Sequence, residues 1–338
     1  MTLRYRIYGL NLTSDFPIPG LREKTEISAN PDVIVQLGPE PEWVSNARRL
    51  PSLMLQSIPA SPETKDPAVL LTSLGDEKFF QLSYSDGTCF VMDSKVTRIW
   101  GKPGDGQSME DLATYFLGPV MGFTLRRRGT TALHASALCI DGKAVVLTGE
   151  AGAGKSTTAA ALALRGFPVL CEDIASMEEV DSGFSVEVGH PRVCLWPESV
   201  EMLMGSKDAL PLLSPNWDKC YFPLDGEMGS LEMRKRPLGA IYMLAPREKS
   251  ANAPRVESLS SREVLLELVQ NTYMNWILDR GQRAAEFALL SRLIAEVPVQ
   301  RIVPHADPSR IGSLCELIAA DARAVLAGKS RMAAAAGQ

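Results

Sequence analysis

The sequence predicts an α/β domain with a mixed sheet, preceded by a smaller domain built mainly from strands. Short strand-like runs separated by Pro, Gly and Ser dominate the first third of the chain. From His134 onward, strand-like runs alternate with a glycine-rich loop and with helical patterns rich in Ala and Leu. Because residues 101–106 are polar and rich in turn formers, we expect domains at residues 1–105 and 106–327 and a disordered tail at residues 328–338.

The first domain is expected to be a meander of short strands. The runs contain residues that favour strands and are separated by Pro, Gly and Ser. Ser85, Asp86 and Gly87 lie between two of these runs and predict a hairpin, because Gly tolerates the positive φ that such a turn needs. The expected strands cover residues 5–10, 32–37, 53–58, 68–72, 78–84, 88–92 and 96–100.

The second domain is expected to begin with a helix at residues 109–127 and to continue with strands and helices. A short buried strand at residues 144–147 precedes the glycine-rich loop, and a helix rich in Ala and Leu follows the loop and stops at Gly166. Further strands are expected at residues 133–140, 168–171, 184–188 and 238–244. The closing helices are expected at residues 262–278, 283–296 and 308–326.

The glycine-rich loop matches the pattern G-x-x-x-x-G-K-[ST] in full. Backbone N–H groups of such a loop, together with the positive end of the following helix, surround a polyphosphate. Lys155 would reach the β- and γ-phosphates, and the Ser156 hydroxyl would bind Mg²⁺. We therefore expect a nucleoside triphosphate to bind here; the alternative is a strand-to-helix turn without a ligand. The residues expected to bind the nucleotide are Gly149, Glu150, Ala151, Gly152, Ala153, Gly154, Lys155, Ser156 and Thr157.

Composition narrows the classes of partner. The formal net charge is -5, which disfavours nucleic-acid binding because that needs a basic face. The 6 cysteines show no C-x-x-C spacing, as expected in a reducing cytosol rather than in a disulfide framework or a zinc site. The most apolar stretch, residues 112–125, is too short to span a bilayer, and the N-terminus lacks the apolar core of a signal peptide. We therefore expect a cytoplasmic protein that binds neither nucleic acid nor membrane, and formation of a homo-oligomer is left open.

Two acidic residues, Glu172 and Asp173, follow the apolar strand that ends at Cys171. This is the carboxyl end of a strand expected to neighbour the loop strand, where ligands of open α/β sheets bind. Adjacent side chains of an extended strand point to opposite faces, so one carboxylate can face a metal and the other a phosphoryl acceptor. Two close carboxylates also raise one pKa, which suits a base near neutral pH. The alternative is an exposed acidic turn.

Three further residues are candidates for contacts with phosphate groups. His134 lies on a strand-like run, where a lone His is more often a core or surface residue. Arg192 stands at a strand-to-helix junction and suits a γ-phosphate or substrate contact; a surface Arg near a helix start is the alternative. Lys219 lies in a long loop with Pro and Ser, and loops of this kind often close over active sites as lids. The sequence has neither the N-K-x-D motif of GTPases nor the L-S-G-G-Q motif of ABC-type ATPases.

The order of these motifs resembles the catalytic domain of bacterial HPr kinase/phosphorylase, itself similar to phosphoenolpyruvate carboxykinase. In that family a strand bearing H-[AG]-[SV] precedes the phosphate-binding loop, and an acidic pair closes the next strand. The matching residues are His134-Ala135-Ser136, the loop at residues 149–156, and Glu172-Asp173. The resemblance implies that Glu172, where the family has Asp, is the general base, that Asp173 acts with Ser156 at the metal, and that His134 contacts phosphate. The family's long glycine-rich signature is absent, so its carrier-protein substrate is not expected.

Within this superfamily, the chain looks like the kinases encoded with lasso-peptide biosynthetic genes. Those kinases phosphorylate a serine at the C-terminus of the precursor peptide. The resemblance therefore implies an α/β kinase fold of the HPr kinase type, ATP and Mg²⁺ as cofactors, and a precursor peptide or small protein as substrate. The motifs that carry this likeness are Tyr5-x-x-Tyr8-Gly9-Leu10, Pro17-Ile18-Pro19-Gly20-Leu21, Pro191-Arg192-Val193-Cys194-Leu195-Trp196-Pro197 and Asp218-Lys219.

The leading hypothesis is an ATP- and Mg²⁺-dependent kinase that phosphorylates a seryl hydroxyl in a peptide, with the strand-rich domain presenting the substrate. A kinase of a small metabolite such as free serine is a second hypothesis, which differs only in the acceptor pocket. A third is a nucleotide-sensing regulatory protein without turnover, against which the acidic pair argues because a sensor needs no base. The catalytic residues expected are Glu172, Asp173, His134 and Arg192, with Lys219 as the lid residue.

Overall fold

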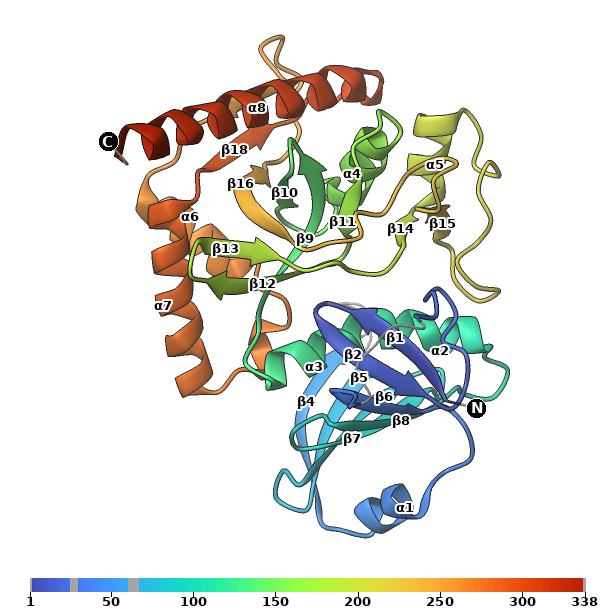
Figure 1. Ribbon diagram of the computed structural model, residues 1–338. Coiled ribbons are helices and arrows are strands. Elements are labelled where there is room, and N and C mark those ends of the chain that lie inside the picture. Colours follow the sequence, from blue (N-terminus) through green and yellow to red (C-terminus); the bar gives the residue numbers. More distant parts are fainter. Residues whose placement is uncertain (1, 25–29, 60–66, 337–338) are drawn as a thin grey trace. The chain divides into compact units, whose positions relative to one another are not determined.

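The chain forms two compact units in a computed structural model that describes residues 2–24, 30–59 and 67–336 (Figure 1). The first unit comprises Met1–Arg128 together with the segment Leu213–Trp217, and the rest of the chain forms the second. The helical stretch after residue 106, which the sequence groups with the second domain, thus lies in the first unit. Among the described residues, none of the helices is both long enough and apolar enough to cross a bilayer.

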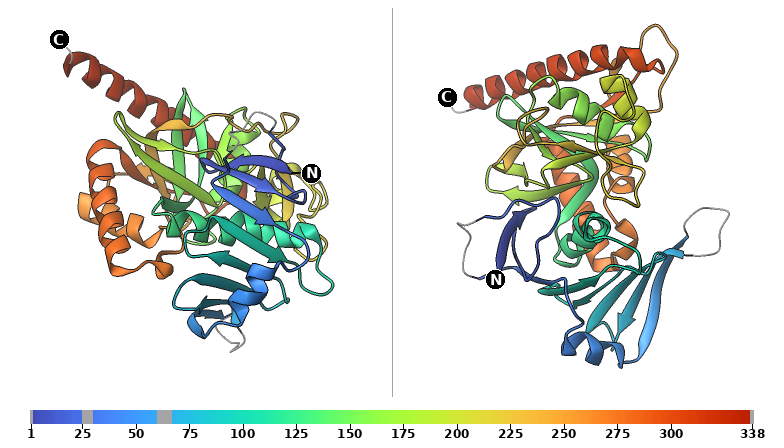
Figure 2. Two further views of the ribbon diagram at one scale, coloured as in Figure 1. Left: turned by 60° about the horizontal axis from the view of Figure 1, so that its bottom comes forward. Right: turned by 90° about the vertical axis from the view of Figure 1, so that its right-hand side faces the viewer.

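A mixed sheet forms the first unit (Figure 2). Its elements are β1 (Leu3–Ile7), β2 (Leu10–Ser14), β3 (Val33–Gln36), α1 (Glu42–Arg48), β4 (Ser52–Pro59), β5 (Pro67–Leu74), β6 (Phe79–Tyr84), β7 (Cys89–Asp93), β8 (Arg98–Lys102), α2 (Met109–Tyr115), η1 (Phe116–Val120) and α3 (Met121–Arg127). Within the described ranges the strand order is β1-β2-β3-β8-β7-β6-β5-β4. The pairs β2–β3 and β3–β8 are parallel, and the other neighbours are antiparallel.

Helices cover both faces of this sheet. Neighbouring side chains of β7 point to opposite faces, so their contacts show which helix lies on each face. Val91 packs with Val44 of α1 and with Trp100. Its neighbour Phe90 contacts Phe116 of η1, with ring centroids 6.4 Å apart. The expected helix at residues 109–127 is interrupted by the π-helical turn η1, which contains Pro119, and Pro lacks the N–H that a regular helix needs.

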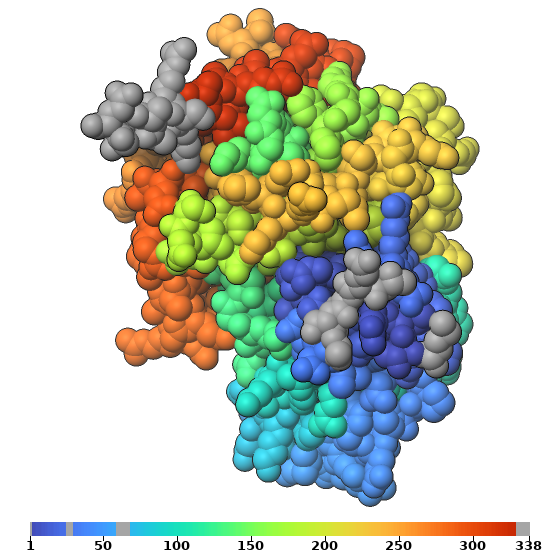
Figure 3. All heavy atoms as spheres, viewed as in Figure 1, coloured from blue at the N-terminus to red at the C-terminus, as the bar shows by residue number. Residues whose placement is uncertain are grey.

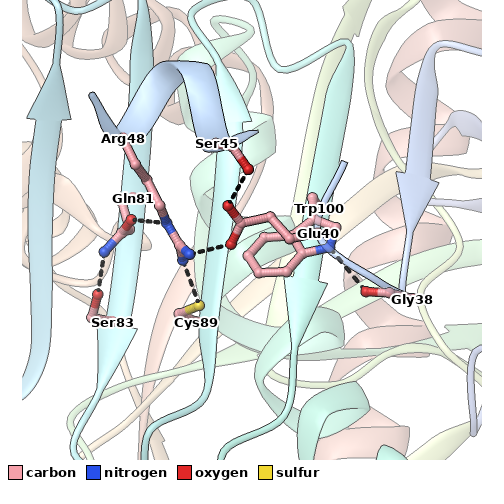
Figure 4. Close-up of polar contacts among 8 residues, drawn as sticks. All are labelled: Gly38, Glu40, Ser45, Arg48, Gln81, Ser83, Cys89 and Trp100. Carbon is pink, nitrogen blue, oxygen red and sulfur yellow. Dashed lines mark hydrogen bonds and ion pairs between the residues drawn. The ribbon is translucent and has the colours of Figure 1, made fainter. Parts of the chain in front are cut away.

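Arg48 fixes the helix α1 to the sheet (Figure 4). Its guanidinium pairs with Glu40, donates to Gln81 Oε1 at 3.2 Å and lies 3.1 Å from the Sγ of Cys89. The guanidinium carbon also lies 5.1 Å from the ring centroid of Trp100. One arginine therefore joins the last turn of α1 to three strands of the sheet.

Asp111 of α2 connects the first unit to the segment Leu213–Trp217. The carboxylate is buried and accepts hydrogen bonds from Ser108 at the helix N-terminus, where the two residues form a capping box. It also accepts from the Ser214 hydroxyl at 2.5 Å and from the Asn216 amide at 2.8 Å. This segment is therefore an integral part of the first unit, although it is far away in the sequence.

A second mixed sheet, flanked by helices, forms the second unit. Its elements are β9 (Thr131–Ile140), β10 (Lys143–Thr148), α4 (Lys155–Ala163), β11 (Val169–Cys171), β12 (Ile174–Val180), β13 (Gly183–Val186), β14 (Arg192–Leu195), α5 (Pro197–Met204), β15 (Cys220–Pro223), β16 (Arg236–Leu244), β17 (Arg255–Glu257), α6 (Ser261–Gln270), η2 (Asn275–Ile277), α7 (Arg280–Glu296), β18 (Val299–Val303), η3 (Pro308–Arg310) and α8 (Ile311–Ala336). In the described part of the chain, β10 lies between β9, which is antiparallel to it, and β16, which is parallel. β18 continues the parallel part beside β16.

The core of the second unit lies between the sheet and the helices α4 and α8. Apolar side chains of β10 and β16 pack there against Ala and Leu residues of α4 and against Ile318 and Leu314 of α8. Because α4 is lined with small residues, it can approach the sheet closely. The connection between β15 and β16 (gold in Figure 3) lies at the surface, where Met233 is 56% exposed.

The later helices differ in part from the sequence-based expectation. The helix expected at residues 262–278 ends at Gln270, because the chain then turns back to pair with β9 through a bridge between Thr272 and Leu133. The helix α8 runs through most of the segment expected to be disordered, and residues 337–338 lie outside the described chain. The strands β12, β14, β15, β17 and β18 were not expected from the sequence.

Candidate functional site

The glycine-rich loop connects β10 to α4, as its strand and helix signals predict. Gly149 has a φ of +140°, and a Cβ there would lie only 2.6 Å from the backbone oxygen of Leu244. Gly154 has a φ of +100° and directly precedes α4. Since L-residues rarely adopt these φ values, glycine is required at both places. The resulting turn presents the N-terminal N–H groups of α4, a site that suits an anion.

Lys155 closes the loop on itself. Its ammonium group is buried and donates to the backbone oxygens of Gly149 at 2.8 Å and of Glu150 at 3.0 Å. Burial lowers the pKa of Lys155, while the negative charges of Asp173 and Glu172 oppose that shift. The cation is therefore held inside the loop by backbone carbonyls rather than by a carboxylate.

The strand pairing of β9 brings the acidic pair to this loop. β11 and β12 both pair with β9, and the acidic pair lies at the kink between them. Since β9 is antiparallel to both β10 and β11, the strands β10 and β11 end at the same edge of the sheet. The expectation that β11 neighbours the loop strand directly is thus wrong, because β9 lies between the two. The carboxylates reach the loop nevertheless.

A tight turn separates the directions of Glu172 and Asp173. The N–H of Ile174 donates to the backbone oxygen of Glu172 at 2.8 Å, and Asp173 between them has a φ of +68°. Such a three-residue turn is rare and strained, and strain of this kind persists where the surrounding structure holds it. It points the two carboxylates to different partners, as the expected division of roles requires.

Glu172 faces the phosphate-binding loop. Its carboxylate is buried and accepts a hydrogen bond from the Ser156 hydroxyl at 2.7 Å. Burial raises the pKa of Glu172 to about 7, and the charge of Asp173 adds to this rise. The Ser156 hydroxyl thus lies against Glu172, and the expected action of Ser156 with Asp173 at a metal ion stays a prediction.

Asp173 faces His134 and Tyr273. The Nδ1 of His134 lies 3.1 Å from Asp173 Oδ1 and 3.1 Å from its backbone oxygen, and the Tyr273 hydroxyl donates to Oδ2 at 3.0 Å. Because both neighbours of Nδ1 are acceptors, that nitrogen must carry a hydrogen. Burial favours the neutral form of Asp173, but the hydrogen bonds and the charge of His134 outweigh it and hold the pKa of Asp173 below its usual range.

Two further cations lie near the acidic pair. Lys219 stands 5.2 Å from the ring centroid of Trp196, and its charge lowers the pKa of Glu172. Arg192 is buried, and its Nε has no hydrogen-bond partner among the described residues. Both cations, together with the acidic pair, influence the pKa of Cys194, which burial raises to about 12. The site thus contains the residues that the sequence singles out: the loop, the acidic pair, His134, Arg192 and Lys219.

Two residues of the site were not predicted from the sequence. Tyr273 comes from a stretch expected to be helical, so its approach to Asp173 was not foreseen. Arg247 follows β16, and its Nη2 would lie 2.8 Å from a Cβ at Gly154, which places the guanidinium against the loop. Its position after a strand parallel to β10 was the available signal, since ligands bind at the carboxyl ends of such strands.

The oxygen atoms at the loop fit a magnesium ion bound together with a nucleotide. No group of three or more His, Cys, Asp and Glu side chains within the described ranges could hold a metal by itself. Mg²⁺ prefers few protein ligands, keeps several waters and binds mainly to phosphate oxygens. The Ser156 hydroxyl and the Glu172 carboxylate, which lie 2.7 Å apart, supply two hard oxygen ligands of the required type.

Comparison with solved structures gives distant likenesses, and comparison with families and curated proteins gives none. Among solved structures, the chain is similar to the Hpr(Ser) kinase/phosphatase from Coxiella burnetii, with 15% sequence identity and a TM-score of 0.34. The likeness covers 60% of this chain and 95% of that chain.

Proposed function

We propose that the chain is an ATP- and Mg²⁺-dependent phosphotransferase that phosphorylates a serine hydroxyl of a peptide. The observation that carries this proposal is the hydrogen bond between Ser156 of the loop and Glu172 of the acidic pair. It joins a phosphate-binding loop to a carboxylate, and a second carboxylate, Asp173, lies next to it with different partners. A kinase needs both, since one helps to hold the metal and the other accepts the proton of the acceptor hydroxyl.

Cations of the site would bind the phosphate groups and stabilise the charge of the transferred phosphoryl group. Lys155 and the loop N–H groups would hold the β- and γ-phosphates, with the hydrogen bonds of Lys155 to the loop oxygens lengthening as phosphate binds. Lys219 and Arg192 would stabilise the γ-phosphate; the charge of Lys219 acts on Glu172 and the buried Nε of Arg192 has no partner among the described residues, which supports this role. Bound Mg²⁺ would supply charge neutralisation between the β- and γ-phosphates.

The geometry supports a division of roles opposite to the one implied by the family resemblance. Glu172 lies against Ser156, so it is the better ligand for a metal ion at the loop. Asp173 is oriented by His134 and Tyr273, and this orientation favours it as the base, whereas the pKa of Glu172, raised to about 7, favours Glu172. We propose Asp173, because orientation also leaves Glu172 at the loop. In the reaction, the serine oxygen attacks the γ-phosphorus, the bond to the β–γ bridging oxygen breaks, ADP leaves, and Asp173 takes the serine proton. The assignment of the base to Glu172 stays a prediction that the experiment below decides.

The acceptor is proposed to be the C-terminal serine of a lasso-peptide precursor. The motifs in the N-terminal region and around Arg192 that resemble the lasso-peptide kinases are the support for this choice. A peptide is larger than a metabolite and needs a surface beyond the phosphate site, which the strand-rich unit would provide. We propose ATP as the phosphoryl donor.

Transfer of radiolabelled phosphate from ATP tests the proposal. The acceptors are a peptide ending in Ser, the same peptide ending in Ala, and free serine, each with Mg²⁺ and with a chelator. We expect labelling of the Ser-ending peptide alone, and only with Mg²⁺. Labelling of free serine would indicate a metabolite kinase, and ATP binding without transfer or hydrolysis would indicate a nucleotide sensor.

Two variants separate the roles of the acidic pair. Asp173→Asn is expected to lower the transfer rate roughly 10²- to 10⁴-fold at saturating Mg²⁺, the range for loss of a general base. Glu172→Gln is expected to raise the Mg²⁺ concentration needed for half-maximal rate and to recover at high Mg²⁺. The reverse pattern would assign the base to Glu172. Wild-type rates in both variants would exclude the acidic pair from the chemistry.

A further inference from the structure

A groove with no role so far lies beside the phosphate-binding loop. It is lined by the first turn of α4, by Arg247 after β16, and by the connection from β18 to α8. Thr157 and Thr158 contribute from α4, directly after the residues expected to bind phosphate. The groove is therefore continuous with the phosphate site, but it contains neither member of the acidic pair.

The strand order determines which end of a nucleotide could occupy this groove. The acidic pair lies on the β9 side of β10, because β11 and β12 pair with β9. The groove lies on the other side, where β16 and β18 run parallel to β10 and are followed by Arg247 and His305. If the γ-phosphate lies near the acidic pair, the polyphosphate crosses the loop and the nucleoside leaves on the side of the groove.

The lining suits the edge of a flat, partly polar ring, because the enclosed part of the groove measures only about 40 Å³ and the rest of a nucleoside would lie in its open part. Met202, Ile311 and Leu314 provide an apolar wall, and Arg247 and Arg310 provide guanidinium groups. Guanidinium planes stack on aromatic rings and also bind phosphate, so both functions are useful next to an α-phosphate. Ligand pockets commonly combine mainly apolar walls with a few polar groups of fixed position.

His305 is such a fixed polar group. Its Nδ1 accepts a hydrogen bond from the backbone N–H of Asp307 at 2.9 Å. A ring nitrogen that accepts carries no hydrogen, so the neutral ring has its hydrogen on Nε2. The ring is thus held in one orientation, with Nε2–H available as a donor and with an aromatic face for stacking.

We propose that the groove beside the phosphate-binding loop binds the base and ribose of the nucleotide, and that His305 contacts the base. The inference rests on the proposed binding of a nucleoside triphosphate at the loop. It assigns the nucleoside end of the ligand to the connection between β18 and α8, a part of the chain to which the sequence analysis gave no function.

Titration calorimetry with ATP and with inorganic tripolyphosphate, both as Mg²⁺ complexes, tests the assignment. Tripolyphosphate lacks the nucleoside, so it reports on the loop alone. We compare wild type with Ala306→Phe, which would fill the groove, and with His305→Ala, which removes the ring. Each variant is expected to weaken ATP binding about tenfold, as loss of one aromatic contact would, and to leave tripolyphosphate binding within about twofold. Lys155→Ala is the matched control and should weaken both ligands.

Three results would overturn the inference. The first is that the wild type binds ATP no more tightly than tripolyphosphate, and the second is that both variants bind ATP as the wild type does. The third is that both variants lose tripolyphosphate binding as much as they lose ATP binding. The readout is binding, so it is independent of phosphoryl transfer. A protein that shows the expected binding pattern but transfers no phosphate would refute the kinase proposal and leave the groove assignment standing.

Discussion

Substitution of single glycines in the phosphate-binding loop tests the local geometry most directly. Gly149 and Gly152 both have positive φ, at +140° and +80°. A Cβ at Gly149 would lie 2.6 Å from the backbone oxygen of Leu244, whereas a Cβ at Gly152 would meet nothing within 4 Å. Gly152→Ala therefore carries only the cost of a left-handed residue, about 1–2 kcal/mol. Gly149→Ala adds a clash with a backbone atom that cannot rotate away, so strain and overpacking of about 1–3 kcal/mol each are expected.

Thermal unfolding of the two variants provides the comparison. One kcal/mol corresponds to a Tm shift of about 2–4 °C in a unit of this size. We expect Gly149→Ala to lower the Tm about two to three times as much as Gly152→Ala, and to lose ATP binding because β10 and β16 must separate around residue 149. Equal Tm shifts in the two variants, or a wild-type Tm in Gly149→Ala, would show that the described approach of the loop to β16 is incorrect.

Three further predictions concern single side chains. Tyr273→Phe removes the hydrogen bond to Asp173, so we expect phosphoryl transfer to fall about tenfold with ATP affinity unchanged; an equal loss of both in a calorimetric and kinetic comparison would contradict a positioning role. His190 is buried and its pKa is lowered to about 3, mainly by burial and further by Arg192. Below about pH 6.5 the unfolded chain therefore binds a proton that the folded chain does not. As the pH is lowered from 6 to 4, the free energy of unfolding should decrease by up to about 1.4 kcal/mol per pH unit. Urea unfolding measured at several pH values should show a weaker dependence of the free energy of unfolding on pH in His190→Gln. An unchanged pH dependence would refute the role of His190. Arg48→Ala should lower the free energy of unfolding of the first unit by only about 1 kcal/mol, because the contacts it removes are partly exposed. Lys78→Ala, at an exposed position, is the control in thermal unfolding.

The parts of the site encoded by neighbouring residues could be predicted from the sequence. The strand before the loop, the glycines and the start of α4 depend on propensity and turn chemistry within a few residues, and all three are present in the structure. The acidic pair could be found for a similar reason, because its carboxylates directly follow a short apolar strand. Local patterns also predicted most strands of the first unit, where alternation is strong.

The parts that depend on distant contacts could not be predicted. Tyr273 reaches Asp173 only because the chain after α6 pairs with β9, and helix propensity alone favours continuation of that helix. The partner of Ser156 depended on the kink at Asp173, which sets the two carboxylates apart. Likewise, nothing near residues 213–217 indicates that they belong to the first unit, since their partner Asp111 is far away in the sequence.

The hydrogen bonds between Asp111 and the segment Leu213–Trp217 have a consequence for Lys219. Trp217 stacks edge to face with Tyr115, with ring centroids 5.4 Å apart, and only Asp218 separates it from Lys219. The backbone at Lys219 is therefore constrained on both sides, by the anchored segment before it and by β15, which begins at Cys220 directly after it. A change that loosened the anchor, such as loss of the Ser214 hydroxyl, would give this lysine more backbone freedom without altering any residue that contacts its side chain.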